Sequence, residues 1–144
     1  MAVAGAVGLL HLTAVRDAAA AALAQVVDTD PMVFGDAVES LTPPALLLDW
    51  ADPWVEPAAR IGSIGGCQWT ARLQVICIAG RLEPGAGVDV LEQLVSLVVA
   101  RLEADPYTWT LDSVSAPLQR DLAGISYLAA NVVYAVPTSL RESP

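Results

Sequence analysis

Two cysteines, Cys67 and Cys77, are the residues in this chain whose type most directly suggests chemistry. They lie in the segment CQWTARLQVICIAG, where apolar residues alternate as in a β-strand. A strand rises about 3.3 Å per residue, so ten residues of strand place their Cα atoms about 33 Å apart. A disulfide needs Cα atoms within about 7 Å, and the spacing fits no zinc site. We therefore predict small buried thiols that do not pair within this strand.

No other set of residues completes a catalytic or ligand-binding pattern. His11 is the only histidine, and no nearby residue supplies the acid that orients a catalytic imidazole. The glycine groups 62–66 and 84–87 lack the lysine of a phosphate loop and the spacing of a dinucleotide fingerprint. Five carboxylates near one another in the sequence lack the periodicity of a calcium loop: Asp28, Asp30, Asp49, Asp52 and Glu56. We predict no enzyme activity, no cofactor and no metal.

The charge balance excludes several partners. The chain has 144 residues, with 16 acidic residues against seven basic ones and a formal net charge of −9. All seven basic residues are arginines scattered singly, whereas binding to nucleic acid or to an anionic membrane needs clustered cations. An acidic surface that DNA passes without adhering is compatible with this composition. The apolar first segment lacks a basic start, and Arg16-Asp17 interrupts it, so we expect no signal peptide and no membrane partner.

Periodicity predicts the elements that must position any site. Helical spacing favours helices over 3–27 and 88–104, the second with Asp89 and Glu92 at capping-box spacing and Arg101 near its end. Asp52 to Gly66 is rich in proline and glycine and indicates a loop or strand-connecting arm. The last residues, 137–144, read as a polar tail. The remaining segments read as extended: 32–34, 45–50, 67–79, 107–115 (with Trp109, Leu111 and Val114 inward) and 125–136.

The order of these main elements, α-β-β-α-β-β, predicts one α+β domain over residues 1–144. We expect a mixed or mostly antiparallel sheet with both main helices packed on one face. The smooth alanine run from Ala18 to Ala22 fits a surface helix packed on the sheet, which we favour, or a helix pressed against a neighbouring subunit.

The long strand has two different faces when it is read with period two. One face is apolar throughout, from Cys67 to Ala79. The other is polar at first and apolar later, at Ile76 and Ile78. We predict that the second half is covered on both faces, whereas the first half projects with one face wet or facing a partner. This makes three residues of the polar part candidates for an interface: Gln68, Arg72 and Gln74.

Trp54 is the fourth interface candidate. It lies between Pro53 and Pro57 in the acidic arm, where a tryptophan can anchor a protein interface. The alternative is a lid folded back onto the domain's own core, and either role would bury the ring.

The succession of segments resembles a known family. After the first helix come MVFGD, TPPALLLDW, the proline-rich arm, WTARLQVICIAG, the helix VLEQLVSLVVARLEA, the strand YTWTLDSVSAP and the closing GISYLAANVVYAVP. This order resembles the tail terminator proteins of long-tailed (siphovirus-type) bacteriophages, in the form found in phages of actinobacteria. The likeness covers nearly the whole chain and is one of element order, without a diagnostic motif.

The resemblance implies a structural virion protein. Such proteins form a ring, usually of six copies, at the junction of tail and neck. The ring caps the tail tube, stops its polymerisation and joins the tail to a head-completion protein, while DNA passes through without specific binding. The implied partners are other copies of the chain, the major tail tube protein and the neck protein. The implied location is the virion, after assembly in the bacterial host cytoplasm.

Other functions stay open at this point. Another neck or head-completion adaptor shares the ring architecture, and so does a tail tube subunit, which needs a long hairpin for its inner barrel. From a different class, a small cellular dimeric ligand-binding domain or enzyme would need polar and ionisable residues clustered at strand ends. A secreted domain is a further option if the first segment is a signal after all.

Overall fold

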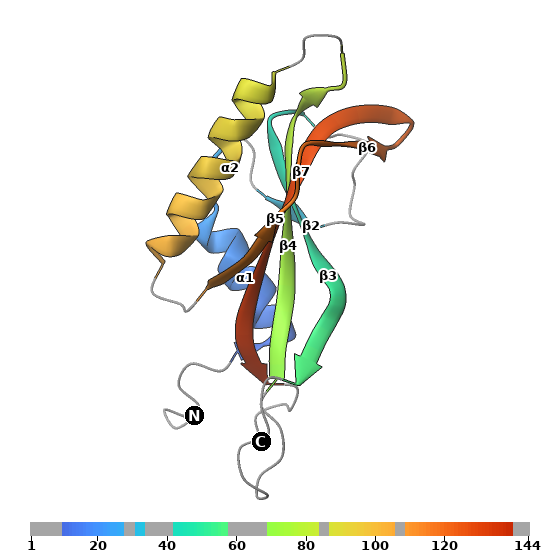
Figure 1. Cartoon of the computed structure of the whole chain (residues 1–144). Coiled ribbons are helices and arrows are strands. Elements are labelled where there is room, and N and C mark those ends of the chain that lie inside the picture. The colour runs from blue at the N-terminus through green and yellow to red at the C-terminus, as the bar shows by residue number, and fades with distance from the viewer. Residues whose placement is uncertain are drawn as a thin grey trace, which may run out of the picture.

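The computed structural model describes residues 10–27, 31–33, 42–57, 69–83, 87–105 and 109–139. It confirms the predicted α+β class, with two helices and a sheet (Figure 1). The elements follow the chain as β1 (Leu10–His11), α1 (Leu12–Ala22), β2 (Met32–Val33), β3 (Ala45–Pro57), β4 (Trp69–Arg81), α2 (Val88–Glu103), β5 (Thr110–Val114), β6 (Leu118–Leu122) and β7 (Ile125–Ser139).

Three long antiparallel strands form the frame of the sheet. β3 and β4 have 13 residues each and β7 has 15, well beyond the usual five or six. The sheet order is β1-β7-β4-β3-β2, and β5 and β6 also pair with β7. The short pairs β1–β7 and β2–β3 are parallel, whereas every other pair is antiparallel. The sheet is therefore mixed and mostly antiparallel, as predicted.

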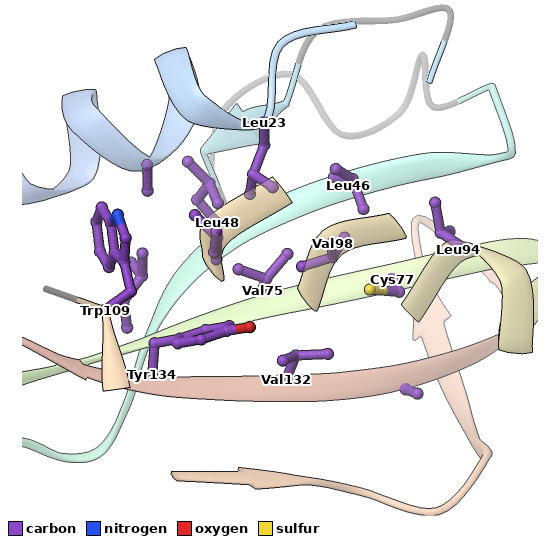
Figure 2. Packing of buried hydrophobic residues seen from close by; sticks show 14 of the residues in the cluster. Leu23, Leu46, Leu48, Val75, Cys77, Leu94, Val98, Trp109, Val132 and Tyr134 are labelled. Carbon is purple, nitrogen blue, oxygen red and sulfur yellow. The ribbon is translucent and has the colours of Figure 1, made fainter. Parts of the chain in front are cut away.

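Both helices pack on one face of this sheet, the helix face (Figure 1). The predicted apolar face of β4 lies here, and Ala71, Leu73, Val75 and Cys77 are fully buried. Figure 2 shows Leu23 of the first helical segment and Val98 of α2 above Val75 and Tyr134. Burying one such leucine or valine contributes roughly 1.5–3 kcal/mol, so this layer supplies most of the stability.

The second helix forms close to where its periodicity predicts. Its buried stripe is Leu91, Leu94, Val98 and Leu102. Asp89 lies in the first turn and Arg101 in the last, but the N-cap is Gly87 and no side chain caps it, so the capping-box prediction is wrong. Arg101 instead donates to the carbonyl oxygens of Ala22 (3.4 Å) and Ala24 (3.0 Å), which lie at the end of α1.

The first helix is shorter than predicted. Residues 3–9 lie outside the described residues, and Leu10 and His11 form a strand that pairs in parallel with Thr138 and Ser139 of β7. Pairing with the sheet thus overrides local helix propensity at these positions. At the other end Gln25 adopts a left-handed backbone (φ 69°), which stops the helix before Val27.

A second, smaller core covers the opposite face of the sheet, the outer face. Ile76 and Ile78 are fully buried there, which confirms that the second half of β4 is covered on both sides. The cover comes from the β6–β7 hairpin, which we did not predict. Its two-residue turn places Ala123 (φ 51°) and Gly124 (φ 78°) in left-handed conformations, and an alanine in the first position is an uncommon turn signal. The other members of this core are Leu47, Leu122, Tyr127 and Ala129.

Two predictions near the C-terminus are corrected in part. Trp109 is buried as expected, but Leu111 and Val114 are exposed because β5 is an edge strand that pairs only with β7 among the described strands. The strand predicted to end at Val136 continues to Ser139, so the supposed polar tail begins inside the sheet. Thr138 is only 2% exposed there, since it lies opposite Trp69 and Leu10.

Candidate subunit interface

The predicted arm of residues 52–66 is a strand in its first part. Asp52 to Pro57 continue β3 past a register irregularity between Trp50 and Val55, and residues 58–66 lie outside the described residues. This strand end, with Trp69–Gln74 of β4 and Tyr134–Ser139 of β7, forms what we call the open half of the sheet. Its helix face is packed, but the second core does not extend over its outer face. The open half is therefore where the sheet can meet a partner.

Arg72 lies on the outer face of the open half and serves contacts within its own chain. Its guanidinium donates to Asp112 of β5, with Nη2 at 2.6 Å and Nε at 3.2 Å from Oδ2. Nη1 donates to the carbonyl oxygen of Pro53 (3.2 Å), and Glu56 lies 3.6 Å from Nε. Only 17% of the Arg72 side chain is exposed. The residue thus connects β3 to β5 across two intervening strands.

The sequence of β7 makes this bridge possible. Ala135 lies opposite Arg72 in the register of β4 and β7, and it also pairs with Thr110 of β5. Its methyl group leaves room for the arginine side chain to pass over β7 and reach Asp112. We did not predict Asp112 as part of the site, because only the strand register brings residues 72 and 112 together.

The other two polar candidates give less information. Gln74 is half-buried and lies between Asp49 of β3 and Val133 of β7, on the same face as Arg72. Gln68 lies outside the described residues. The structure therefore brings Arg72 and Gln74 together on one face, with Trp54 on the adjacent end of β3.

Trp54 is partly packed on its own chain and partly exposed. Its side chain is stacked on Trp50, with ring centroids 5.5 Å apart and a tilt of 31°. Yet 48% of the residue is exposed, so the ring is not buried as a lid on the domain's own core, and the interface role stays a prediction. A large aromatic surface left half-exposed at a strand end is typical of a residue that a partner covers.

A pocket adjoins this tryptophan pair. We call it the Arg16 pocket, and it has a volume of about 300 Å³. The residues that line it are Leu12, Thr13, Arg16, Trp50 and Trp54. The Nε atom of Arg16 is buried and has no hydrogen-bond partner among the described residues. An unsatisfied buried donor costs about 1–3 kcal/mol, so the pocket favours an occupant that offers an acceptor. Sequence reasoning missed Arg16 because helical periodicity places it only at the border of the buried stripe.

The outer edge of β3 is also open. On the side away from β4, the described residues of β2 pair with β3 at Leu47 and Leu48. Within the described ranges, the edge from Asp49 to Pro57 has no neighbouring strand. Pro53 and Pro57 lack backbone N–H groups, which limits how far another strand can pair along this edge.

The remaining reactive groups belong to the core. Cys77 is a free thiol, and burial raises its pKa to about 12. The hydroxyl of Tyr134 is buried and has no hydrogen-bond partner in the described ranges. Burial, followed by the charges of Glu103 and Cys77, raises its pKa to about 12. Neither group opens to solvent in a way that would support catalysis. Cys67 lies outside the described residues, and nothing is described of the His11 side chain.

Among the residues that the structure describes, no three His, Cys, Asp or Glu side chains gather in a way that could hold a metal ion. No helix in these ranges is long and apolar enough to cross a membrane. A scan against protein-family models finds no match for this chain, and a search of curated proteins finds no match either.

Proposed function

We propose that this chain is the subunit of a homo-oligomeric ring that terminates a bacteriophage tail, capping the tail tube and joining it to the neck. The observation that carries the proposal is the open half of the sheet. There, within the described ranges, a half-exposed Trp54, a β3 edge without a strand partner and a pocket with an unsatisfied arginine lie together. Such a combination at one end of a domain fits a surface that is completed by neighbouring subunits.

The charge of the chain fits a ring through which DNA passes. Six copies would carry 54 formal negative charges, nine from each copy. Arg72, which could have offset this charge on the outer face, is already paired with Asp112 and Glu56. A lumen with part of this acidic surface repels phosphate and resists adhesion to DNA in transit.

The test is to measure the mass of the purified full chain in solution and to image it by electron microscopy, alone and with assembled tail tubes. We expect rings with a central hole, and single rings on tube ends that stop further growth. A chain that stays monomeric or dimeric under both conditions would contradict the proposal.

The variant Trp54→Ala tests whether this tryptophan takes part in ring formation. We expect it to weaken ring formation while the circular dichroism spectrum stays unchanged, because half of the ring is already outside the chain's own core. Leu73→Ala, a truncation in the fully buried part of β4, is the contrasting control and should reduce stability as well. If Trp54→Ala unfolds the chain, Trp54 belongs to the core and the interface role is wrong.

One observation favours a second candidate, the tail tube subunit. β3 and β4 pair as a hairpin of two 13-residue strands, which is long enough to contribute to an inner barrel. The same microscopy distinguishes the two functions. A tube subunit would stack into extended tubes at high concentration, whereas a terminator would form single rings and shorten the tubes to which it is added.

A further inference from the structure

The Arg16 pocket has the chemistry of a receptor for a carboxylate flanked by apolar groups. The Nε of Arg16, buried and without a partner in the described part of the chain, favours an anionic acceptor, and Thr13 adds a hydroxyl. Trp50 and Trp54 supply apolar ring surface next to it. A purely apolar occupant would leave the guanidinium nitrogen unsatisfied, and a basic one would repel it.

A surface of matching chemistry lies elsewhere on the same chain. We call it the acidic cap. It combines three exposed carboxylates with exposed large apolar residues. Asp89 and Glu92 lie one helical turn apart on one side of α2, and the exposed Val88 precedes Asp89 in the first turn. The members of the acidic cap are Leu82, Glu83, Val88, Asp89, Val90 and Glu92.

The two surfaces lie at opposite ends of the molecule (Figure 1). The Arg16 pocket lies near the start of β4. Its residue Leu12 follows His11, which pairs with Ser139 of β7, and the adjacent Thr138 pairs with Trp69, the first residue of β4. Val90 instead lies against Gly80 and Arg81, at the end of the same strand. A strand of 13 residues spans about 40 Å, so the pocket and the cap of one chain cannot meet.

We propose that the Arg16 pocket of one copy binds the acidic cap of the next copy, in a head-to-tail contact. Asp89 accepts from the Arg16 guanidinium, and the adjacent Val88 covers the exposed face of Trp54. A contact between two different surfaces generates a closed ring when the rotation between copies allows it. This inference rests on the proposed ring, and it specifies which surfaces join the subunits.

The test uses two charge reversals in the full chain, Arg16→Glu and Asp89→Arg. Each places like charges at the contact, so we expect each variant alone to assemble at least about a hundredfold more weakly than the parent chain. Combining both reversals in one chain restores opposite charges and should restore assembly. Mixing the two single variants should do the same, because each supplies the surface that the other lacks.

Matched controls separate the contact from general charge effects. Asp17→Arg changes an exposed position next to Arg16 on α1, and Glu103→Arg changes the far end of α2. Both should leave assembly within about twofold of the parent chain, in line with the small effect of exposed charges. Analytical ultracentrifugation gives the association constants, and circular dichroism checks that every variant is folded.

Three results would overturn the inference. Normal assembly of Arg16→Glu or Asp89→Arg shows that the contact lies elsewhere, while rings formed by the parent chain still support the proposed function. Loss of assembly in both folded single variants without restoration in the double variant shows that the two surfaces do not meet. If the parent chain forms no oligomer, with or without tail tubes, both the proposed ring and the proposed contact are wrong.

Discussion

The two halves of β4 are built from the same strand but have different surroundings. In the covered half, Ile76 and Ile78 are buried on the outer face by the β6–β7 hairpin, while Val75 and Cys77 are buried under the helices. In the open half, Ala71 and Leu73 are equally buried on the helix face, but Arg72 and Gln74 stay partly exposed on the other.

This difference separates stability from recognition along one strand. A position buried on both faces gains hydrophobic free energy on each side, so the covered half can tolerate little change. The open half is held by one packed face and by the Arg72 ion pairs, which leaves the described edge of β3 and the Arg16 pocket beside Trp54 to serve a partner. We therefore expect substitutions in the covered half to cost more free energy of unfolding than substitutions in the open half.

Ile76→Ala should be the most damaging of these changes. It removes buried methyl groups from the covered half, and truncations of this kind cost about 2–5 kcal/mol in the free energy of unfolding. Gln74→Ala, two residues earlier on the same face, should cost no more than about 0.5 kcal/mol because the side chain is half-exposed. Urea denaturation of both variants measures the difference, and equal costs would show that the two halves are packed alike.

The second-largest effect is expected at alkaline pH, which should lower the free energy of unfolding through Cys77 in the covered half. The pKa of Cys77 is about 12 in the folded chain against 9.0 for a free thiol, so between these values the unfolded chain binds fewer protons. The free energy of unfolding should therefore be independent of this group below pH 9 and fall as pH rises toward 12. Tyr134 acts in the same direction, from pH 10 upward.

The control for this effect is Cys77→Ala, whose stability should fall less steeply between pH 9 and 10. That interval isolates the thiol, because Tyr134 has an ordinary pKa of 10.0 in the unfolded chain. Denaturant titrations at half-unit steps of pH give the slopes. The same slope in both proteins would mean that the thiol is not protected by burial.

The sequence predicts the covered half better than the open half, for a physical reason. Period-two alternation and the change at Ile76 depend on burial alone, and burial by a protein's own core leaves a clear pattern in the chain. Helix α2, both core faces of β4 and the α+β class followed from such patterns. Strand β6 did not, because Gln119, Arg120 and Asp121 carry no apolar alternation and the Ala-Gly turn is atypical.

The contacts of the candidate site depend on register, which a single sequence does not specify. Arg72 was predicted as an interface residue from its polar face, yet its partners Asp112 and Glu56 come from two other strands. Arg16 joins Trp50 and Trp54 only because β1 places the start of α1 beside β7. The arm looked like a loop because proline is rare in central strands, whereas an edge strand accepts it.

The Arg72–Asp112 pair should contribute less than any buried methyl group in the covered half. Exposed ion pairs contribute about 0.2–1 kcal/mol, and this one gains from its two short contacts to a single carboxylate. A double-mutant cycle with Arg72→Ala and Asp112→Ala should give a coupling energy within that range, and it should decrease at 1 M salt. A coupling above about 2 kcal/mol would place the pair among buried networks and remove the contrast between the two halves.

The smallest effect is expected at Arg101, which connects the helices above the two halves. Its guanidinium donates to the carbonyl oxygens of Ala22 and Ala24, where the end of α1 carries partial negative charge. Arg101→Met keeps most of the apolar stem and removes these bonds, so we expect a loss of about 0.3–1 kcal/mol. Hydrogen exchange should then quicken at the Leu23 amide, which donates to Ala19, while the amides of β4 around Ile76 stay protected. Faster exchange in β4 as well would mean that α1 and the covered half open as one cooperative unit, and that the division between the halves does not extend to the helix layer.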